Sequence, residues 1–263
     1  MELGLGNKVA LVAAASRGLG FAIAAELARE GASLVMCSRN GASLERAAQA
    51  IAAQTGTLPV AIPADVSRPD EVARLVDGAI ARFGRIDVLV TNAGGPPAGP
   101  FESHDAAAWD AAFRLTLASA VELTRRVLPG MKDRRWGRII NVTSIAVKQP
   151  VDQLILSNSL RAAVTGFART LANEVAAFGI TVNNVLPGYT RTERIDELAA
   201  ARSGREGISA DAVRAEFERQ IPAGRLGEPQ ELAALTAFLA SERAAYITAQ
   251  SIAVDGGWIR SLV

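Results

Sequence analysis

The chain has 263 residues, of which 49% are hydrophobic and 21% charged, a composition typical of a globular protein with a large buried core. Its 28 basic and 27 acidic residues give a formal net charge of +1, which argues against nucleic acid or a membrane surface as the main partner. The single cysteine, Cys37, excludes an internal disulfide and is expected in the core. The sequence opens without the basic region of a signal peptide, and no apolar stretch approaches the ~20 residues that cross a bilayer, so we expect a cytoplasmic protein.

Short apolar runs alternate with amphipathic segments of helical length along the whole chain. The apolar runs predict buried parallel strands at Val9–Ala13, Ser33–Met36, Val60–Ile62, Val88–Val90, Arg138–Val142, Thr181–Val185 and Ile252–Val254. The segments between them predict helices at Phe21–Arg29, Ala42–Gln54, Asp70–Phe83, Ala107–Lys132, Leu156–Phe178 and Gln230–Leu239. Because strict alternation of strand and helix places helices on both faces of a parallel sheet, the sequence predicts one α/β domain with a doubly wound sheet of about seven strands.

Residues 193–227 interrupt this rhythm before the last helix. They predict two further helical pieces, Glu193–Arg202 and Ser209–Gln220, joined by the residues SGREG. Val213, Phe217 and Ile221 recur at spacings of four and form an apolar stripe, which either closes on an apolar substrate or packs the segment down.

The loop after the first strand, AAASRGLG, predicts a phosphate site. Ligands of such a sheet bind beyond the carboxyl ends of its strands, and the two glycines lead into a helix whose free backbone N–H groups can face a phosphate. Two glycines can also simply make a turn, but their place between the first strand and a helix favours a dinucleotide. The residues assigned to this loop are Ala14, Ser16, Arg17, Gly18, Leu19 and Gly20.

The end of the second strand indicates which dinucleotide binds. A cofactor with free ribose hydroxyls would usually meet an acidic residue there, but this chain has Ser38, Arg39 and Asn40. Arg39 and Arg17 suit a 2′-phosphate, because a guanidinium can hold it through paired hydrogen bonds. The alternative is that both are solvated surface arginines. We expect NADP(H) to bind in preference to NAD(H).

Three further loops complete the expected cofactor site. Asp65 follows the third strand and could accept a hydrogen bond from the adenine amino group or cap the following helix. The residues TNAGG after the fourth strand are small enough to let a cofactor approach the backbone, and LPGYTRT after the sixth makes a turn beside the nicotinamide. The residues assigned from these loops are Asp65, Val66, Asn92, Ala93, Gly94, Pro187, Gly188, Thr190 and Thr192.

These motifs together resemble the short-chain dehydrogenase/reductase family over essentially the whole chain. The resemblance is carried by SRGLG at 16–20, ADV at 64–66, NAG at 92–94, INVTS at 140–144, LPGYTRT at 186–192 and VDGGW at 254–258. The run IPAGRLGEPQELA resembles the branch that contains 3-oxoacyl-carrier-protein reductases. The resemblance implies one Rossmann domain over residues 1–263, a substrate lid at 193–227, NAD or NADP as cofactor, and a homotetramer with the helices at 107–132 and 156–178 in one interface.

The expected catalytic residues depart from that family. Its members usually carry Tyr-x-x-x-Lys at the start of the fifth helix, and counting thirteen residues on from Ser144 places Ser157 and Arg161 at those two positions. An asparagine expected in the fourth helix is Thr116, so only Ser144 remains of the usual four. Ala13 and Ala14 also stand where Thr-Gly is common, and the extra methyl group would narrow the approach to the pyrophosphate.

The proton donor is therefore a separate question. An aliphatic hydroxyl is a far poorer acid than a phenol, and a guanidinium stays charged, so Ser157 and Arg161 are expected to position substrate and cofactor, with Arg161 reaching the nicotinamide ribose and Ser144 bonding the substrate carbonyl. We expect Lys148, partly buried beside Arg161, or a water that it holds, to supply the proton. Tyr189 is the alternative donor.

Two functions remain open on the sequence. The first is an NADPH-dependent carbonyl reductase or alcohol dehydrogenase of the short-chain type, acting on 3-oxoacyl or similar keto substrates with an atypical proton donor. The second is a non-catalytic NADP(H)-binding sensor or scaffold. A retained Ser144 and a full-length lid favour the enzyme, because a protein without catalysis has no chemical need for either. No metal-ligand set is assigned.

Overall fold

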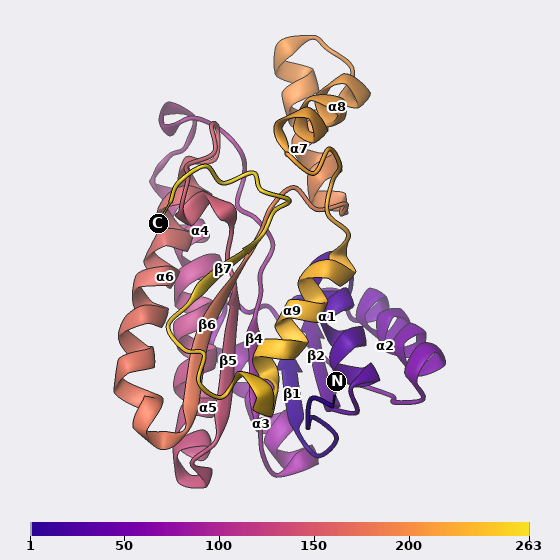
Figure 1. Cartoon of the computed structure of the whole chain (residues 1–263), viewed down its shortest axis with the longest axis vertical. Coiled ribbons are helices and arrows are strands. Elements are labelled where there is room, and N and C mark those ends of the chain that lie inside the picture. The colour runs from indigo at the N-terminus through magenta and orange to yellow at the C-terminus, as the bar shows by residue number, and fades with distance from the viewer. Residues whose placement is uncertain (1, 263) are drawn as a thin grey trace.

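Seven parallel strands form one sheet within residues 2–262, the part of the chain that the computed structural model describes, in the order β3-β2-β1-β4-β5-β6-β7 (Figure 1). All seven predicted strands are present, with ends within two residues of the prediction. Their bounds are β1 Val9–Val12, β2 Ser33–Ser38, β3 Val60–Pro63, β4 Val88–Thr91, β5 Gly137–Val142, β6 Ile180–Pro187 and β7 Ser251–Val254. The strand order reverses between β1 and β4, which is where ligands bind in sheets of this kind.

Nine α-helices occur in the described residues, and none of them is both long and apolar enough to cross a membrane. Their bounds are α1 Gly18–Arg29, α2 Gly41–Thr55, α3 Pro69–Phe83, α4 Ala106–Phe113, α5 Ser119–Arg134, α6 Ile155–Val175, α7 Glu193–Glu206, α8 Ala210–Gln220 and α9 Pro229–Ala240. The prediction of one continuous helix at 107–132 is wrong, because a π turn at Arg114–Ala118 divides this segment into α4 and α5.

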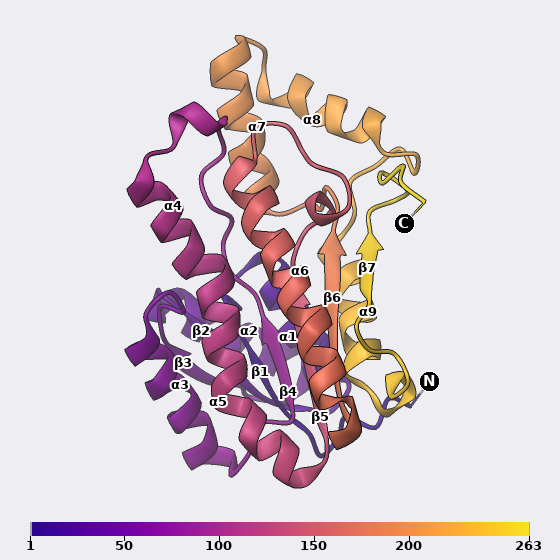
Figure 2. The same cartoon turned by 90° about the vertical axis from the view of Figure 1, so that its left-hand side faces the viewer.

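The helices form two layers, one on each face of the sheet (Figures 1 and 2). One layer contains α1, α2 and α9, whose apolar side chains share a core with one face of the strands. The other contains α3, α5 and α6, which build a second core on the opposite face. Cys37 belongs to this second core, as predicted, and burial raises the pKa of its thiol to about 12.

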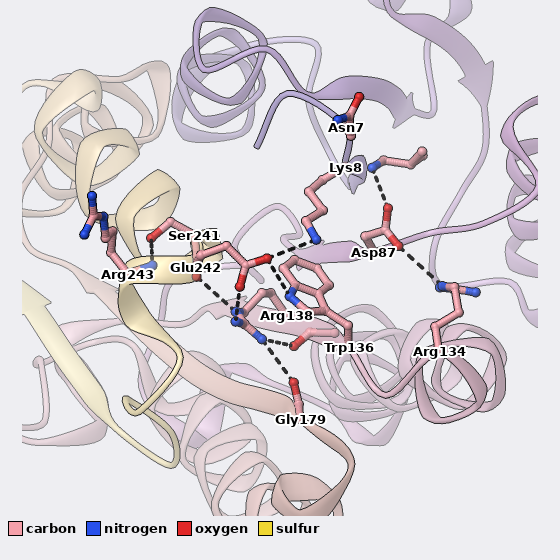
Figure 3. Close-up of polar contacts among 12 residues, drawn as sticks. Asn7, Lys8, Asp87, Arg134, Trp136, Arg138, Gly179, Ser241, Glu242 and Arg243 are labelled. Atoms are coloured by element: carbon pink, nitrogen blue, oxygen red, sulfur yellow. Dashed lines mark hydrogen bonds and ion pairs between the residues drawn. The ribbon is translucent and has the colours of Figure 1, made fainter. Parts of the chain in front are cut away.

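Arg138 in β5 is 2% exposed, which is unusual for a cation within a parallel sheet (Figure 3). Its guanidinium donates hydrogen bonds to the carbonyl oxygens of Ser241 at 3.2 Å and Gly179 at 3.1 Å. It also lies 4.4 Å from the ring centroid of Trp136 and 3.9 Å from a carboxylate oxygen of Glu242. These contacts tie β5 to the ends of α6 and α9, at the amino end of the sheet.

The lid helices α7 and α8 stand above the carboxyl ends of the strands (Figure 2). The apolar stripe of α8 packs the lid down: Val213, Phe217 and Ile221 are at most 6% exposed and form a small core with Trp258 and Leu186. Of the two roles that the sequence left open for this stripe, the structure therefore favours packing, and the walls of the adjoining cavity come from other residues.

Candidate active site

A cavity of about 920 Å³ lies at the carboxyl ends of the strands, between the loops after β1 to β6 and the lid helix α7. It is large enough for a dinucleotide and a small substrate together. Most of the residues that the sequence assigned to the site line this one cavity. They are Ala14, Ser16, Arg17, Gly18, Leu19, Ser38, Arg39, Asn40, Asp65, Val66, Asn92, Ala93, Gly94, Ser144, Ser157, Arg161, Pro187, Gly188, Thr190 and Thr192.

The loop after β1 has the geometry of a phosphate cradle. Gly18 has φ +55°, and α1 begins at this residue with no side-chain hydrogen bond capping its first N–H groups. Gly20 is not among the cavity-lining residues. It packs so closely against the loop that a Cβ at this position would stand 2.2 Å from the Ala14 carbonyl oxygen. Ala14 itself has φ +49°, a conformation that costs an alanine about 1–2 kcal/mol. The loop thus fits a bound pyrophosphate, at some strain.

Two cations line the same cavity, one just after β2 and one in the helix α2 that follows it. Arg39, and Arg46 of α2, both line it, both are exposed, and neither has an ion-pair partner within residues 2–262. Arg17 was expected to bind a 2′-phosphate together with Arg39. Its guanidinium instead lies 3.8 Å from the carboxylate of Glu197 on the lid. Asp65 accepts hydrogen bonds from the backbone and hydroxyl of Ser67, so it orders its own loop and does not cap α3.

Ser157 and Arg161 form a hydrogen-bonded pair on the first turns of α6. Arg161 Nε donates to Ser157 Oγ at 3.2 Å, and Nη1 donates to the carbonyl oxygens of Val142 at 2.9 Å and Thr143 at 2.7 Å. Burial, together with the nearby cation of Arg194, lowers the pKa of Arg161 to about 10, so it stays charged at neutral pH. Because Ser157 accepts from a cation, its own proton is free to donate into the cavity and is polarised for doing so.

Ser144 and Tyr189, which both carry hydroxyl groups, also line this cavity. Ser144 Oγ accepts a hydrogen bond from the Ala146 N–H at 3.1 Å, which leaves the hydroxyl proton free. The ring of Tyr189 stacks on Phe217 with centroids 4.6 Å apart and meets Trp258 edge-on at 5.9 Å. Burial raises the pKa of Tyr189, so its phenol keeps its proton at neutral pH.

One expectation from the sequence is wrong. Lys148 is exposed and absent from the cavity walls, not partly buried beside Arg161, because the short 3-10 turn at Ile145–Val147 carries the chain out to the surface before this residue. Gly20 is not among the residues that line the cavity, and its assignment to the cofactor site stays a prediction.

Known proteins match this chain in sequence over most of its length. A family model described as enoyl-(acyl carrier protein) reductase matches residues 13–259. D-beta-hydroxybutyrate dehydrogenase of Cupriavidus necator is 36% identical over 259 residues, which cover 97% of this chain and 99% of that protein. The 3-oxoacyl-acyl-carrier-protein reductase of Escherichia coli is 36% identical over 251 residues, covering 95% and 97%. The chain belongs to the short-chain dehydrogenase/reductase family.

A solved short-chain reductase has nearly the same fold. The crystal structure of L-sorbose reductase from Gluconobacter frateurii, complexed with NADPH and L-sorbose, matches 100% of both chains with a TM-score of 0.94 at 33% identity. The resemblance that the sequence motifs predicted is therefore confirmed, as is the Rossmann-like fold. The chain is an oxidoreductase of this family.

Thr116 marks a further polar feature of this short-chain dehydrogenase/reductase. It lies in the π turn between α4 and α5, is 7% exposed, and its Oγ1 has no hydrogen-bond partner within residues 2–262. Together with Asn92, Ser119 and Arg161 it borders a second cavity of about 20 Å³, which has room for a single water. The back of Arg161 therefore faces a polar space, separate from the main cavity.

The sequence alone missed four charged residues of the cavity wall: Arg46, Glu193, Arg194 and Glu197. Arg46 lies one turn beyond the start of α2, and the other three lie in the first turns of α7. A signal was available for Arg194, because a cation at the second residue of a helix opposes the helix dipole and so calls for a reason outside the helix.

Proposed function

We propose that the protein is an NADPH-dependent carbonyl reductase, working in reverse as an alcohol dehydrogenase. One observation carries this proposal: a single cavity joins the uncapped start of α1 and the unpaired Arg39 to the hydroxyl groups of Ser144 and Ser157. The names of the relatives support a keto or hydroxy substrate, since they refer to a hydroxy acid, a 3-oxoacyl group and a ketose sugar. The structure of the sorbose reductase contains NADPH by its own description, which supports the same cofactor here.

The residues present fit this cofactor. The N–H groups at Gly18 and the small residues Asn92–Gly94 leave room for the backbone to approach a pyrophosphate and a ribose. Arg39 and Arg46 would hold a 2′-phosphate, because neither is engaged by a carboxylate of the described chain. The bound cofactor supplies hydride to the carbonyl carbon.

The chain's own groups then act on the carbonyl oxygen. Ser144 and Ser157 each have a free hydroxyl proton to donate, and the Arg161 cation behind Ser157 stabilises the negative charge that develops on the oxygen. One donor of this kind is worth about 10²–10³ in rate. We propose Tyr189 as the group that gives its proton to that oxygen, since it is a phenol that lines the same cavity and an alkoxide is the stronger base.

This chemistry departs from that of the usual family tyrosine and lysine. We infer that Ser157 and Arg161 occupy those two positions. Together they bind and polarise the substrate carbonyl, while the proton comes from another element. The resulting active site places the acid on the loop after β6 and the electrostatic stabilisation on α6.

We also propose that residues 1–263 act as one domain, that the protein is cytoplasmic, and that it is a homotetramer. Small residues along α6 permit close helix packing, and Phe113 and Val121, which are exposed on α4 and α5, would be covered in such an assembly. Light scattering that shows only a ~27 kDa species at micromolar concentration would contradict the tetramer.

The decisive experiment is a screen of ketones, 3-oxoacyl thioesters and an enoyl thioester with NADPH and NADH, followed by the loss of nicotinamide absorbance. We expect reduction of ketones with NADPH, and at least a tenfold lower turnover in Tyr189→Phe with unchanged NADPH affinity. The enoyl thioester tests the reaction that the family description names. Tight NADPH binding without reduction of any compound would favour the sensor or scaffold instead.

A further inference from the structure

Two guanidinium groups, those of Arg161 and Arg194, line the main cavity, and the proposed reduction uses only that of Arg161. Arg161 makes all of its hydrogen bonds to neutral oxygens and has no ion-pair partner within residues 2–262, and its Nη2 donates to none of them. Arg194 approaches from the lid helix α7 and lines the same cavity. Its one carboxylate neighbour, Glu197, lies 3.3 Å away and is shared with Arg17.

The position of Arg194 is fixed against the loop after β4. Its Nη2 donates a hydrogen bond to the Pro96 carbonyl oxygen at 2.9 Å, and its guanidinium atoms lie 2.8 Å from where a Cβ on Gly95 would stand. The flat guanidinium therefore rests on bare backbone, and any side chain at residue 95 would displace it. This arrangement holds the cation in one place before a ligand arrives, which reduces the entropy lost on binding.

This placement is electrostatically unfavourable for the protein alone. Arg194 is the second residue of α7, where the helix dipole favours anions, and Arg161 is close enough for the two like charges to repel. An anion held between the two guanidiniums would offset the repulsion between them and the unfavourable interaction of Arg194 with the helix dipole. Both forks also have the planar geometry that matches a carboxylate.

The cofactor phosphates are not the anion that fits here. Neighbouring residues of α7 face opposite ways: the Glu193 carboxylate lies toward Gly18 of the phosphate loop, whereas Arg194 lies toward Pro96. The cavity that the two arginines line also has apolar side chains in its walls, which include Ala111, Val151, Leu154 and Leu198. Such walls suit a short alkyl chain.

We propose that Arg161 and Arg194 form a carboxylate-binding subsite, and that the preferred substrate is a short oxo acid instead of a neutral ketone. This inference rests on the proposed reductase activity. The carboxylate bridges the two guanidiniums while the keto oxygen meets Ser144 and Ser157. Hydride adds to the keto carbon and a proton to its oxygen, so the product is the hydroxy acid and the carboxylate is unchanged.

The test compares acids with their neutral counterparts. We expect the kcat/KM for 3-oxobutanoate to exceed that for its methyl ester by about 10- to 100-fold, the range for a charge-assisted pair. Arg194→Met should remove this preference by lowering the value for the acid alone, Arg194→Lys should restore part of it, and the NADPH dissociation constant should stay within about twofold. Arg191→Met is the matched control, because this exposed arginine pairs with Glu228 outside the cavity and should leave the preference intact.

Three results would overturn the subsite: equal kcat/KM for acid and ester, an unchanged preference in Arg194→Met, or a raised NADPH dissociation constant in that variant. A binding measurement separates this inference from the reductase activity. Calorimetry on the NADPH-saturated protein should give a dissociation constant for butanoate at least about tenfold below that for butanamide, and Arg194→Met should abolish the difference. If no ketone is reduced but butanoate binds in this way, the subsite stands and the reductase proposal fails. If ketones are reduced but butanoate does not bind, the reductase stands and the subsite fails.

Discussion

The buried Arg138 allows a direct test of what stabilises a cation inside the sheet. Its guanidinium has two kinds of partner. The first are carbonyl oxygens within hydrogen-bond distance, those of the buried Ser241 and Gly137 and of the exposed Gly179. The second is the Glu242 carboxylate at 3.9 Å, whose side chain is 50% exposed. Arg138→Met removes both kinds of contact. Glu242→Gln removes the ion pair with Arg138 and also the one with Lys8 at 3.1 Å, and keeps a side chain of nearly the same size (Figure 3).

The structure gives different magnitudes for the two changes. Arg138→Met leaves two buried carbonyl groups without a donor, each at a cost of about 1–3 kcal/mol, while the removal of a buried charge returns part of this. We expect a net loss of about 2–4 kcal/mol in the free energy of unfolding. Glu242→Gln should cost about 1 kcal/mol or less at neutral pH, because both ion pairs of this half-exposed carboxylate are screened by water.

The pH dependence provides a second check on Glu242. Burial opposes the ionisation of this carboxyl group, but hydrogen bonds from Lys8 and Trp136 outweigh it and lower its pKa below the usual 4.5. Its contribution to stability is therefore present above about pH 4.5 and is lost as the pH falls through the lower folded-state value. The difference between wild type and Glu242→Gln should shrink over that window.

The assay is urea unfolding followed by circular dichroism at one fixed protein concentration, since assembly would otherwise change the apparent stability. The NADPH affinity of both variants should be unchanged, because the cluster lies at the amino end of the sheet and the cavity at the other. A loss in Glu242→Gln as large as that in Arg138→Met would refute the reasoning, since the ion pair would then be the dominant contact.

Three further predictions concern the site. Arg39→Met should weaken NADPH binding about tenfold and leave NADH binding unchanged; equal affinities of the wild type for both cofactors would contradict this. Ala14→Gly should stabilise the protein by up to about 1 kcal/mol by relieving its positive φ and should tighten NADPH binding, whereas Ala249→Gly, at φ +61° away from the cavity, should change stability alone. Lys148→Met should turn over ketones normally because its side chain is exposed, and Ser157→Ala should lower kcat by about 10² at unchanged NADPH affinity; the reverse pattern would restore the lysine as proton donor.

Much of the cofactor half could be predicted from the sequence. Seven apolar runs predicted the seven strands, because a parallel strand covered on both faces must be apolar throughout. The sequence also located the loops that follow these strands, and the carboxyl ends of parallel strands necessarily share one edge of the sheet. The residues from Ala14 to Thr192 that line the cavity therefore come together with no information beyond strand order and direction.

The substrate half was decided by the tertiary structure. The exposure of Lys148 depends on a turn that three residues of 3-10 helix create, and the pairing of Arg17 with Glu197 depends on how the lid settles over the phosphate loop. The position of Arg194 in the wall of the cavity depends in addition on the bare backbone of the loop after β4. These residues lie on loops and on a lid whose positions follow from packing between distant segments. The local sequence pattern shows only whether a segment is apolar and whether its apolar residues recur with the period of a helix or of a strand.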